Sequence, residues 1–217
     1  MRDSNGPGLF MQQNGKGVRM KMRFLLAALL LATTAAHAEP VAITPDLMSV
    51  TVPTPDGPVE ISRVQDNDAV IEGEFARIAR PCPNFCVQPM VPAEGVTPIG
   101  ELEMLGFLND PDVVVIDGRV RPDFLTGAIP GAINVPYTEA ADRLGELGCE
   151  PDFDGWICEG DNIKSAALYC NGPWCGQSPT AARRMIEAGF PAEKIYYYRA
   201  GMQGWRMLGL TVAMPGQ

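Results

Sequence analysis

Two cysteines five residues apart stand where an apolar run gives way to a loop. Residues 165–178 read SAALYCNGPWCGQS, so Cys170 ends the apolar run and Cys175 lies within the loop. The asparagine, glycine and proline that follow Cys170 break regular structure. A thiol in such a place can act as a nucleophile once it has lost its proton. The spacing alone leaves two interpretations open, a reactive thiol, or a structural pair that is either a disulfide or two buried thiols.

The segments on either side of this loop predict a strand and a helix. Residues 166–169 are an apolar run typical of a buried strand. Ser178 and Pro179 are typical of a helix start, and Gly189 of a helix end. A loop between a strand and a helix directs its amides and the positive helix end into one cavity. We therefore expect Cys170 at the bottom of that cavity, with a pKa lowered by these donors.

The first 38 residues are typical of a leader. A short basic stretch precedes apolar residues 24–36, and Ala36-His37-Ala38 fits a small-x-small cleavage site. The apolar stretch is short for a membrane span, which needs about 20 residues. We therefore expect a signal peptide over residues 1–38, in which residues 1–19 are a doubtful start. The mature chain would begin at Glu39 and be periplasmic or secreted, with no stable membrane insertion.

Loss of this leader would change the chemistry that the chain can perform. The leader holds the only histidine, His37, and five of the 17 basic residues but one of the 26 acidic residues. Without an imidazole, Ser-His-Asp and Cys-His catalysis are excluded, and a catalytic zinc site is disfavoured. The acidic remainder argues against nucleic acid or an anionic membrane as a partner. We expect no cofactor and no metal.

Residues 39–97 are predicted to be an extension with little core of its own. Alternating segments at 48–52 and 59–64 flank a Pro-Asp-Gly turn and predict a β-hairpin. A proline-rich stretch with Cys82 and Cys86 follows. A local disulfide is favoured there over a metal or iron–sulfur site. A second redox pair that relays with Cys170 is a third alternative.

Residues 98–217 alternate between helical and strand patterns, which predicts a mainly parallel, three-layer α/β fold. Outside the central stretch, helices are predicted at 98–108, 138–147 and 201–208, and strands at 112–117, within 127–136 and at 195–198. Cys149 and Cys158 lie in a polar insertion that a disulfide would close. Reactive groups in such folds lie beyond the carboxyl ends of strands, where Cys170, Asp117 and Arg119 fall. For Asp117 a structural salt bridge is the preferred interpretation.

Three segments of this region resemble signature segments of the rhodanese family, in the family's order. They are VVVIDGRVRPDFLTGAIPGAINVPY, then LYC with its loop and SPTAARRMIEAGF, then IYYYRAGMQGWRMLGLTV. The resemblance implies a sulfurtransferase fold in which Cys170 accepts a sulfane sulfur and holds it as a persulfide. The amides of residues 171–177 would surround this sulfur, which would pass to a thiol or to cyanide. The expected substrate-binding residues are Asn171, Gly172, Trp174, Gly176, Gln177, Ser178 and Arg119.

The loop departs from the family's pattern in three ways. It is two residues longer than usual, and Gln177 stands where an arginine often ends it. A larger anion, as in phosphatases and arsenate reductases of this fold, would need a cation that residues 171–178 lack. The third departure is Cys175, a second cysteine within the loop. It would attack a Cys170 persulfide as a resolving thiol, or form a resting disulfide with Cys170.

The leading prediction is an exported sulfurtransferase that uses Cys170, with Cys175 as a redox partner. Its partners would be a small sulfur-containing substrate or a thiol acceptor protein. A non-catalytic sulfur-carrier or binding module is one alternative, and a thiol–disulfide oxidoreductase that uses both cysteines is another. Trp174 would either form a wall of the cavity or cover the loop.

Overall fold

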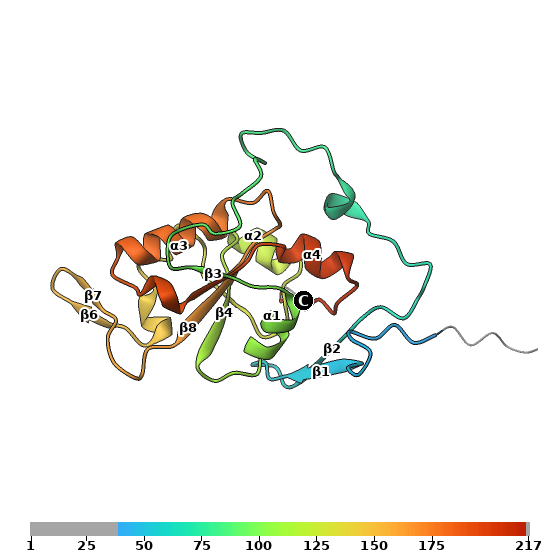
Figure 1. Cartoon of the computed structure of the whole chain (residues 1–217), viewed down its shortest axis with the longest axis horizontal. Coiled ribbons are helices and arrows are strands. Elements are labelled where there is room, and N and C mark those ends of the chain that lie inside the picture. Colours follow the sequence, from blue (N-terminus) through green and yellow to red (C-terminus); the bar gives the residue numbers. More distant parts are fainter. Residues whose placement is uncertain (1–38, 216–217) are drawn as a thin grey trace, which may run out of the picture. The chain divides into compact units, whose positions relative to one another are not determined.

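The fold is built around a five-stranded parallel sheet, in a computed structural model that describes residues 39–215 (Figure 1). The expected leader, residues 1–38, lies outside the described residues. The strand order is β3-β9-β8-β4-β5. The strands are β3 (Thr97–Pro98), β4 (Val113–Asp117), β5 (Ile133–Asn134), β8 (Ser165–Tyr169) and β9 (Ile195–Tyr198). The predicted mainly parallel α/β fold is confirmed, and its middle strand is the one that Cys170 follows.

The three inner strands end level with one another. The parallel register pairs Asp117 of β4 with Tyr169 of β8, and Tyr169 with Tyr198 of β9. These strands are apolar because both of their faces are covered. Their carboxyl ends therefore form one edge of the sheet, at which Asp117 and Cys170 lie close together.

Helices cover both faces of this sheet and create a core on each side. Side chains alternate along β8. Ala166 and Leu168 pack against α3 (Gln177–Glu187), whereas Ala167 and Tyr169 pack against α1 (Glu101–Phe107) and α4 (Gly201–Met207). The short α2 (Arg121–Leu125) follows β4. Within residues 39–215, no helix has both the length and the apolar character that a membrane crossing requires.

Two helix predictions were wrong in their extent. The helix α3 begins at Gln177 with Gly176 as its N-cap, so Ser178 lies in the first turn instead of capping it. Its hydroxyl is held against Gly118, where an added Cβ would approach it to 2.9 Å. The helix expected at residues 138–147 reduces to a 3-10 turn, η2 (Leu144–Leu147). Gly148, which ends that turn at a φ of 88°, stops the helix there.

The polar insertion after η2 forms a small antiparallel hairpin. Its strands are β6 (Glu150–Asp152) and β7 (Gly155–Ile157). The expected disulfide between Cys149 and Cys158 closes the base of this hairpin. Both cysteines are buried in the core next to α3.

The N-terminal extension shares the core of the sheet. Its strands β1 (Ser49–Val52) and β2 (Val59–Ser62) form the predicted antiparallel hairpin. Val52 and Ile61 are fully buried in the same cluster as α1 and α4. A backbone hydrogen bond also joins the hairpin to the end of the chain, since the Thr211 N–H donates to the Ser62 carbonyl oxygen at 3.0 Å. The hairpin is therefore anchored to the α/β fold by its apolar face and by its edge.

We predict that Ile61→Ala lowers the free energy of unfolding by about 2–5 kcal/mol, because the substitution leaves a cavity in a shared core. Urea unfolding followed by tryptophan fluorescence measures this change. The control is Val64→Ala, at a side chain that is 49% exposed, for which we expect a change within about 0.5 kcal/mol. Equal effects of the two substitutions would show that the hairpin adds nothing to the core.

Candidate active site

Cys170 and Cys175 are free thiols that contact each other at the end of β8. They are 2% and 5% exposed, so protein surrounds both sulfur atoms. The Cys170 thiol donates to the Cys175 carbonyl oxygen at 3.3 Å. The two side chains are also close enough for each to shift the pKa of the other. The pair is therefore two buried free thiols instead of a structural disulfide, and the reactivity of Cys170 stays a prediction.

The two thiols differ in acidity. The pKa of Cys175 is lowered, chiefly by the hydrogen bond that its sulfur accepts from the Cys170 thiol, although burial acts against this. The backbone N–H groups of Gln177 and Asn171 and the charge of Arg119 lower it further. Burial instead raises the pKa of Cys170 well above its ordinary value. The predicted low pKa for Cys170 was wrong, because Cys170 is the deeper thiol and acts as the donor within the pair.

The first turn of α3 supplies donors to both sulfur atoms. The Gln177 N–H is directed at Cys175, and the Ser178 N–H is directed at Cys170. The Gln177 side-chain oxygen also lies 3.8 Å from the Cys175 sulfur. Free N–H groups at a helix start favour negative charge. The predicted site residues Gln177 and Ser178 therefore lie at the thiol pair.

The start of α4 holds the other side of the loop. The Met202 N–H donates to the Cys170 carbonyl oxygen, and the Gln203 N–H to the Asn171 carbonyl oxygen, both at 2.9 Å. Gly201 has a φ of +54° and would place a Cβ against the Cys170 carbonyl group. A Cβ on Gly172 would lie 2.8 Å from the Gln203 side chain. These glycines allow the loop and α4 to approach this closely.

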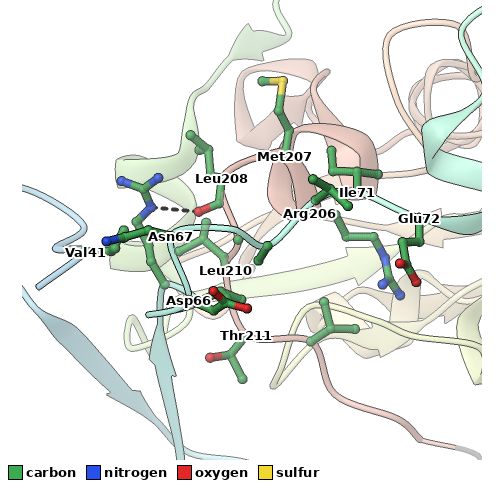
Figure 2. A pocket seen from close by; sticks show the side chains of 16 residues that line it. Val41, Asp66, Asn67, Ile71, Glu72, Arg206, Met207, Leu208, Leu210 and Thr211 are labelled. Atoms are coloured by element: carbon green, nitrogen blue, oxygen red, sulfur yellow. Dashed lines mark hydrogen bonds between the residues drawn. The ribbon is translucent and has the colours of Figure 1, made fainter. Parts of the chain in front are cut away.

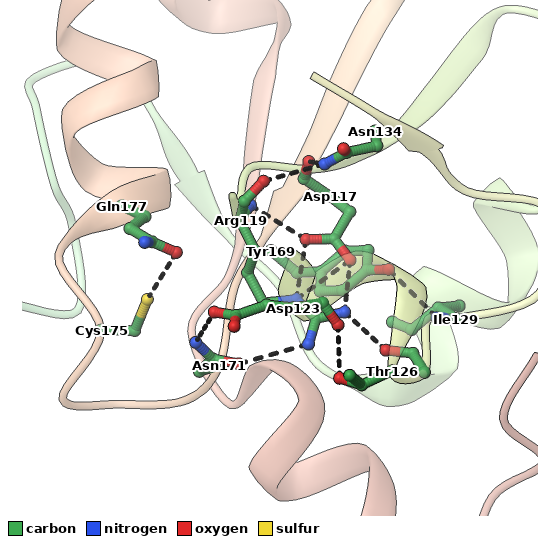
Figure 3. A network of polar contacts seen from close by, with 11 residues as sticks. Asp117, Arg119, Asp123, Thr126, Ile129, Asn134, Tyr169, Asn171, Cys175 and Gln177 are labelled. Carbon is green, nitrogen blue, oxygen red and sulfur yellow. Dashed lines mark hydrogen bonds and ion pairs between the residues drawn. The ribbon is translucent and has the colours of Figure 1, made fainter. Parts of the chain in front are cut away.

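A buried ion pair lies beside the loop (Figure 3). Arg119 Nη2 lies 2.6 Å from Asp117 Oδ2, and both side chains are almost completely buried. Arg119 also donates to Asn171 Oδ1 at 3.3 Å, and Asn171 donates to Asp123 Oδ2 at 3.2 Å. Asp117 is thus the structural salt-bridge partner that the sequence favoured. Arg119 acts on the thiols through Asn171 and through its charge.

Residues 80–88 of the extension, which we call the cap segment, cover Trp174. The rings of Phe85 and Trp174 are 5.2 Å apart in an edge contact, and Arg80 Cζ lies 4.3 Å from the Trp174 ring. The Gln88 N–H donates to the Pro173 carbonyl oxygen at 2.8 Å, and the Gln88 side chain faces Gly176. Trp174 therefore lies between the loop and the cap segment. Sequence reasoning missed Arg80 and Phe85, because no local pattern connects them to so distant a loop.

Tyr197 is a second residue that sequence reasoning missed. Its hydroxyl is buried and has no hydrogen-bond partner in the part of the chain that the structure describes. Burial raises its pKa, and the neighbouring charges of Cys170 and Cys175 raise it further. From the sequence, Tyr197 is only one of three tyrosines in a strand, so nothing distinguishes it.

A separate hollow lies away from the thiols, between residues 63–72 and the end of α4 (Figure 2). Arg63 lines this hollow and donates to the Leu208 carbonyl oxygen at 2.7 Å. None of the predicted site residues lines this hollow. It is therefore distinct from the thiol site.

Known proteins match the α/β part of the chain. Residues 102–208 match the family model of the rhodanese-like domain. The chain is 33% identical over 114 residues to an HTH-type transcriptional regulator of Mycobacterium tuberculosis, which covers 52% of this chain and 43% of the regulator. It is 30% identical over 104 residues to the uncharacterized protein YibN of Escherichia coli K12, covering 48% and 62%. The chain thus spans less than two thirds of each of these curated relatives.

Solved structures also overlap with this region. A thiosulfate sulfurtransferase of Pseudomonas aeruginosa is 23% identical, covers 56% of this chain and 21% of that chain, and gives a TM-score of 0.41. A rhodanese-related protein of Thermoplasma volcanium is 21% identical, covers 54% and 98%, and gives a TM-score of 0.40. The match to the family model identifies residues 102–208 as a rhodanese-like domain, in agreement with the parallel sheet described above.

Proposed function

We propose that the protein is a sulfurtransferase that carries sulfane sulfur as a persulfide on Cys170. The burial of two free thiols beside each other, with the Cys170 thiol against the Cys175 carbonyl oxygen at 3.3 Å, is the observation that supports this proposal most directly. Imidazole is the usual partner of a reactive thiol, and the sequence has none beyond His37. The Cys175 thiolate takes that role, because its pKa is lowered and it lies beside Cys170.

Transfer proceeds in two balanced steps. The Cys170 sulfur attacks the outer sulfur of thiosulfate, a new S–S bond forms, and sulfite leaves with the electron pair of the broken bond. The Cys170 proton passes to the Cys175 thiolate. Cyanide or a thiol then takes the outer sulfur of the persulfide, and Cys170 leaves as a thiolate that regains its proton from Cys175.

Two buried hydroxyl groups support a persulfide in this site. Those of Ser178 and Tyr197 have no hydrogen-bond partner within residues 39–215. Both residues lie at the thiols: Ser178 lowers the pKa of Cys170, and the charges of Cys170 and Cys175 raise the pKa of Tyr197. A buried hydroxyl without a partner is unfavourable by about 1–3 kcal/mol. The outer sulfur of a persulfide is an anionic acceptor, and it would relieve this cost.

We predict that Cys170→Ser abolishes thiocyanate formation from thiosulfate and cyanide, because it removes the sulfur carrier. Cys175→Ser should retain activity at a level about 100-fold lower, the usual loss when a proton acceptor is removed. Thiocyanate is measured by its coloured ferric complex. Activity that survives Cys170→Ser would refute the assignment of the carrier.

We also predict different pH profiles for the wild type and Cys175→Ser. The reactive form is the one in which the pair has lost a proton, so the rate rises as the pH passes the controlling pKa. In the wild type this is the lowered pKa of Cys175, so the rise should fall below the ordinary thiol pKa of about 8.5. In Cys175→Ser the buried Cys170 thiol must ionise by itself, so the rise should move to higher pH. Coincident profiles would contradict the role of Cys175 as proton acceptor.

The same contact favours a second candidate, a thiol–disulfide oxidoreductase. Two thiols in contact can close into a disulfide when a substrate disulfide is reduced. Insulin reduction that requires both Cys170 and Cys175 would favour this activity over sulfur transfer. A persulfide that forms on Cys170 but is never released to an acceptor would instead favour the carrier module.

We further propose that the protein is exported. Two disulfides within the described part of the chain support this, because disulfides persist mainly in oxidising compartments. We predict that the protein recovered from the periplasm of a Gram-negative host begins at Glu39, as measured by N-terminal sequencing. Ala38→Tyr should block cleavage at a site that requires a small residue. Recovery of the uncleaved chain from the cytoplasm would refute the proposal.

A further inference from the structure

The cap segment carries a disulfide next to the thiol pair. Cys82 and Cys86 form this disulfide, and Cys82 is exposed while Cys86 is half-buried. Cys170 and Cys175, in contrast, are reduced and buried. An oxidised pair and a reduced pair are thus held on two facing segments of the same chain.

The contacts between the two segments flank the cysteines on both sides. Phe85, which precedes Cys86, packs on Trp174, which precedes Cys175. Gln88, two residues after Cys86, donates from its N–H to Pro173 and faces Gly176 with its side chain. Residues within two positions of Cys86 therefore contact residues within two positions of Cys175.

Two further contacts, from Arg80 to Trp174 and from Arg199 to Gln88, fasten the cap segment at this place. Arg80 lies against both aromatic rings, at 5.3 Å from Phe85 and 4.3 Å from Trp174. Arg199, which follows β9, donates to the Gln88 carbonyl oxygen at 3.0 Å. A disulfide that served only to close a turn would need none of these links to the loop.

We propose that the Cys82–Cys86 disulfide is a second redox centre that exchanges directly with the Cys170/Cys175 thiol pair. The Cys82/Cys86 pair is oxidised by an oxidant in solution, and it then oxidises the buried Cys170/Cys175 pair by thiol–disulfide exchange within the chain. The proposal uses the same two thiols as the proposed function, but it requires no sulfur transfer.

The exchange takes place in two balanced steps. The Cys175 thiolate attacks Cys86 Sγ, a Cys175–Cys86 bond forms, and Cys82 leaves as a thiolate that takes a proton from solvent. Cys170 then attacks Cys175 Sγ, a Cys170–Cys175 bond forms, and Cys86 leaves as a thiolate that takes up the proton released by Cys170. Two electrons have moved from the buried pair to the exposed pair, together with one proton from Cys170 and one proton from solvent. The lowered pKa of Cys175 agrees with its role as the attacking sulfur.

The first test traps the intermediate in the full chain. Cys82→Ser with Cys170→Ser leaves Cys86 and Cys175 as the reduced thiols, and oxidised glutathione is then added. We expect a Cys86–Cys175 cross-link within single molecules, at a rate independent of protein concentration, measured by mass spectrometry of alkylated peptides. The matched variant, Cys86→Ser with Cys170→Ser, should link Cys82 to Cys175 about tenfold more slowly. Equal rates, cross-links only between molecules, or no cross-link would overturn the proposal.

The geometry of the cap segment provides a second control. Adding Phe85→Ala to the trapping variant removes the contact with Trp174 and should slow the cross-link about tenfold. Val87→Ala changes a side chain of the same segment that is 77% exposed, and it should leave the rate unchanged. A rate that Phe85→Ala does not alter would show that docking of the cap segment plays no part.

The second test measures the effect on the buried pair. Excess oxidised glutathione is added to protein in which both pairs are reduced, and formation of the Cys170–Cys175 disulfide is followed over time. We expect formation about tenfold slower in Cys82→Ser with Cys86→Ser than in the wild type. A looser cap segment in that variant would expose the pair and speed its oxidation, which is the opposite sign. Equal or faster oxidation in the variant, or no oxidation in either protein, would refute the relay. Neither test contains a sulfur donor, so its result is independent of transferase activity.

Discussion

The electrostatic interaction between the buried thiols of Cys170 and Cys175 determines where negative charge can lie in this site. Two buried thiols so close together cannot both ionise, because like charges repel strongly where water is excluded. The pair therefore shares one charge, and the donors around it decide which sulfur holds it. Amides from Asn171 and Gln177 favour Cys175. Cys170 keeps its proton and becomes reactive when Cys175 accepts it.

The buried ion pair of Asp117 and Arg119 holds the loop in a fixed position relative to β4. Its side chains are taken out of water, and removal of one partner from such a pair commonly costs about 3–5 kcal/mol. Arg119 continues from this anchor to Asn171, the residue after Cys170. On the opposite side, α4 also fixes the loop, because its N–H groups donate to the carbonyl oxygens of Cys170 and Asn171. The loop is thus held from two neighbouring elements before any substrate arrives.

The parts of this site that arise from neighbouring residues could be predicted from the sequence. The apolar run before Cys170 and the helix signals after it indicated the strand–loop–helix unit, and the spacing of the other four cysteines indicated two local disulfides. The relative acidity of the two thiols could not be predicted, since it depends on which sulfur lies deeper. The start of α3 at Gln177 was missed because Ser178 and Pro179 are strong start signals by themselves. The cover formed by Arg80 and Phe85 depends on long-range packing that no local pattern encodes.

The extension is attached to the domain with very different strength at its two ends. The hairpin places Val52 and Ile61 in the core, where each buried side chain contributes about 1.5–3 kcal/mol. The cap segment is held by an edge contact between two rings, worth about 0.5–1.5 kcal/mol, and by backbone hydrogen bonds of similar size. Residues 65–70 between them are exposed. The cap segment can therefore separate from Trp174 at a cost of a few hydrogen bonds and ring contacts while the hairpin stays packed in the core.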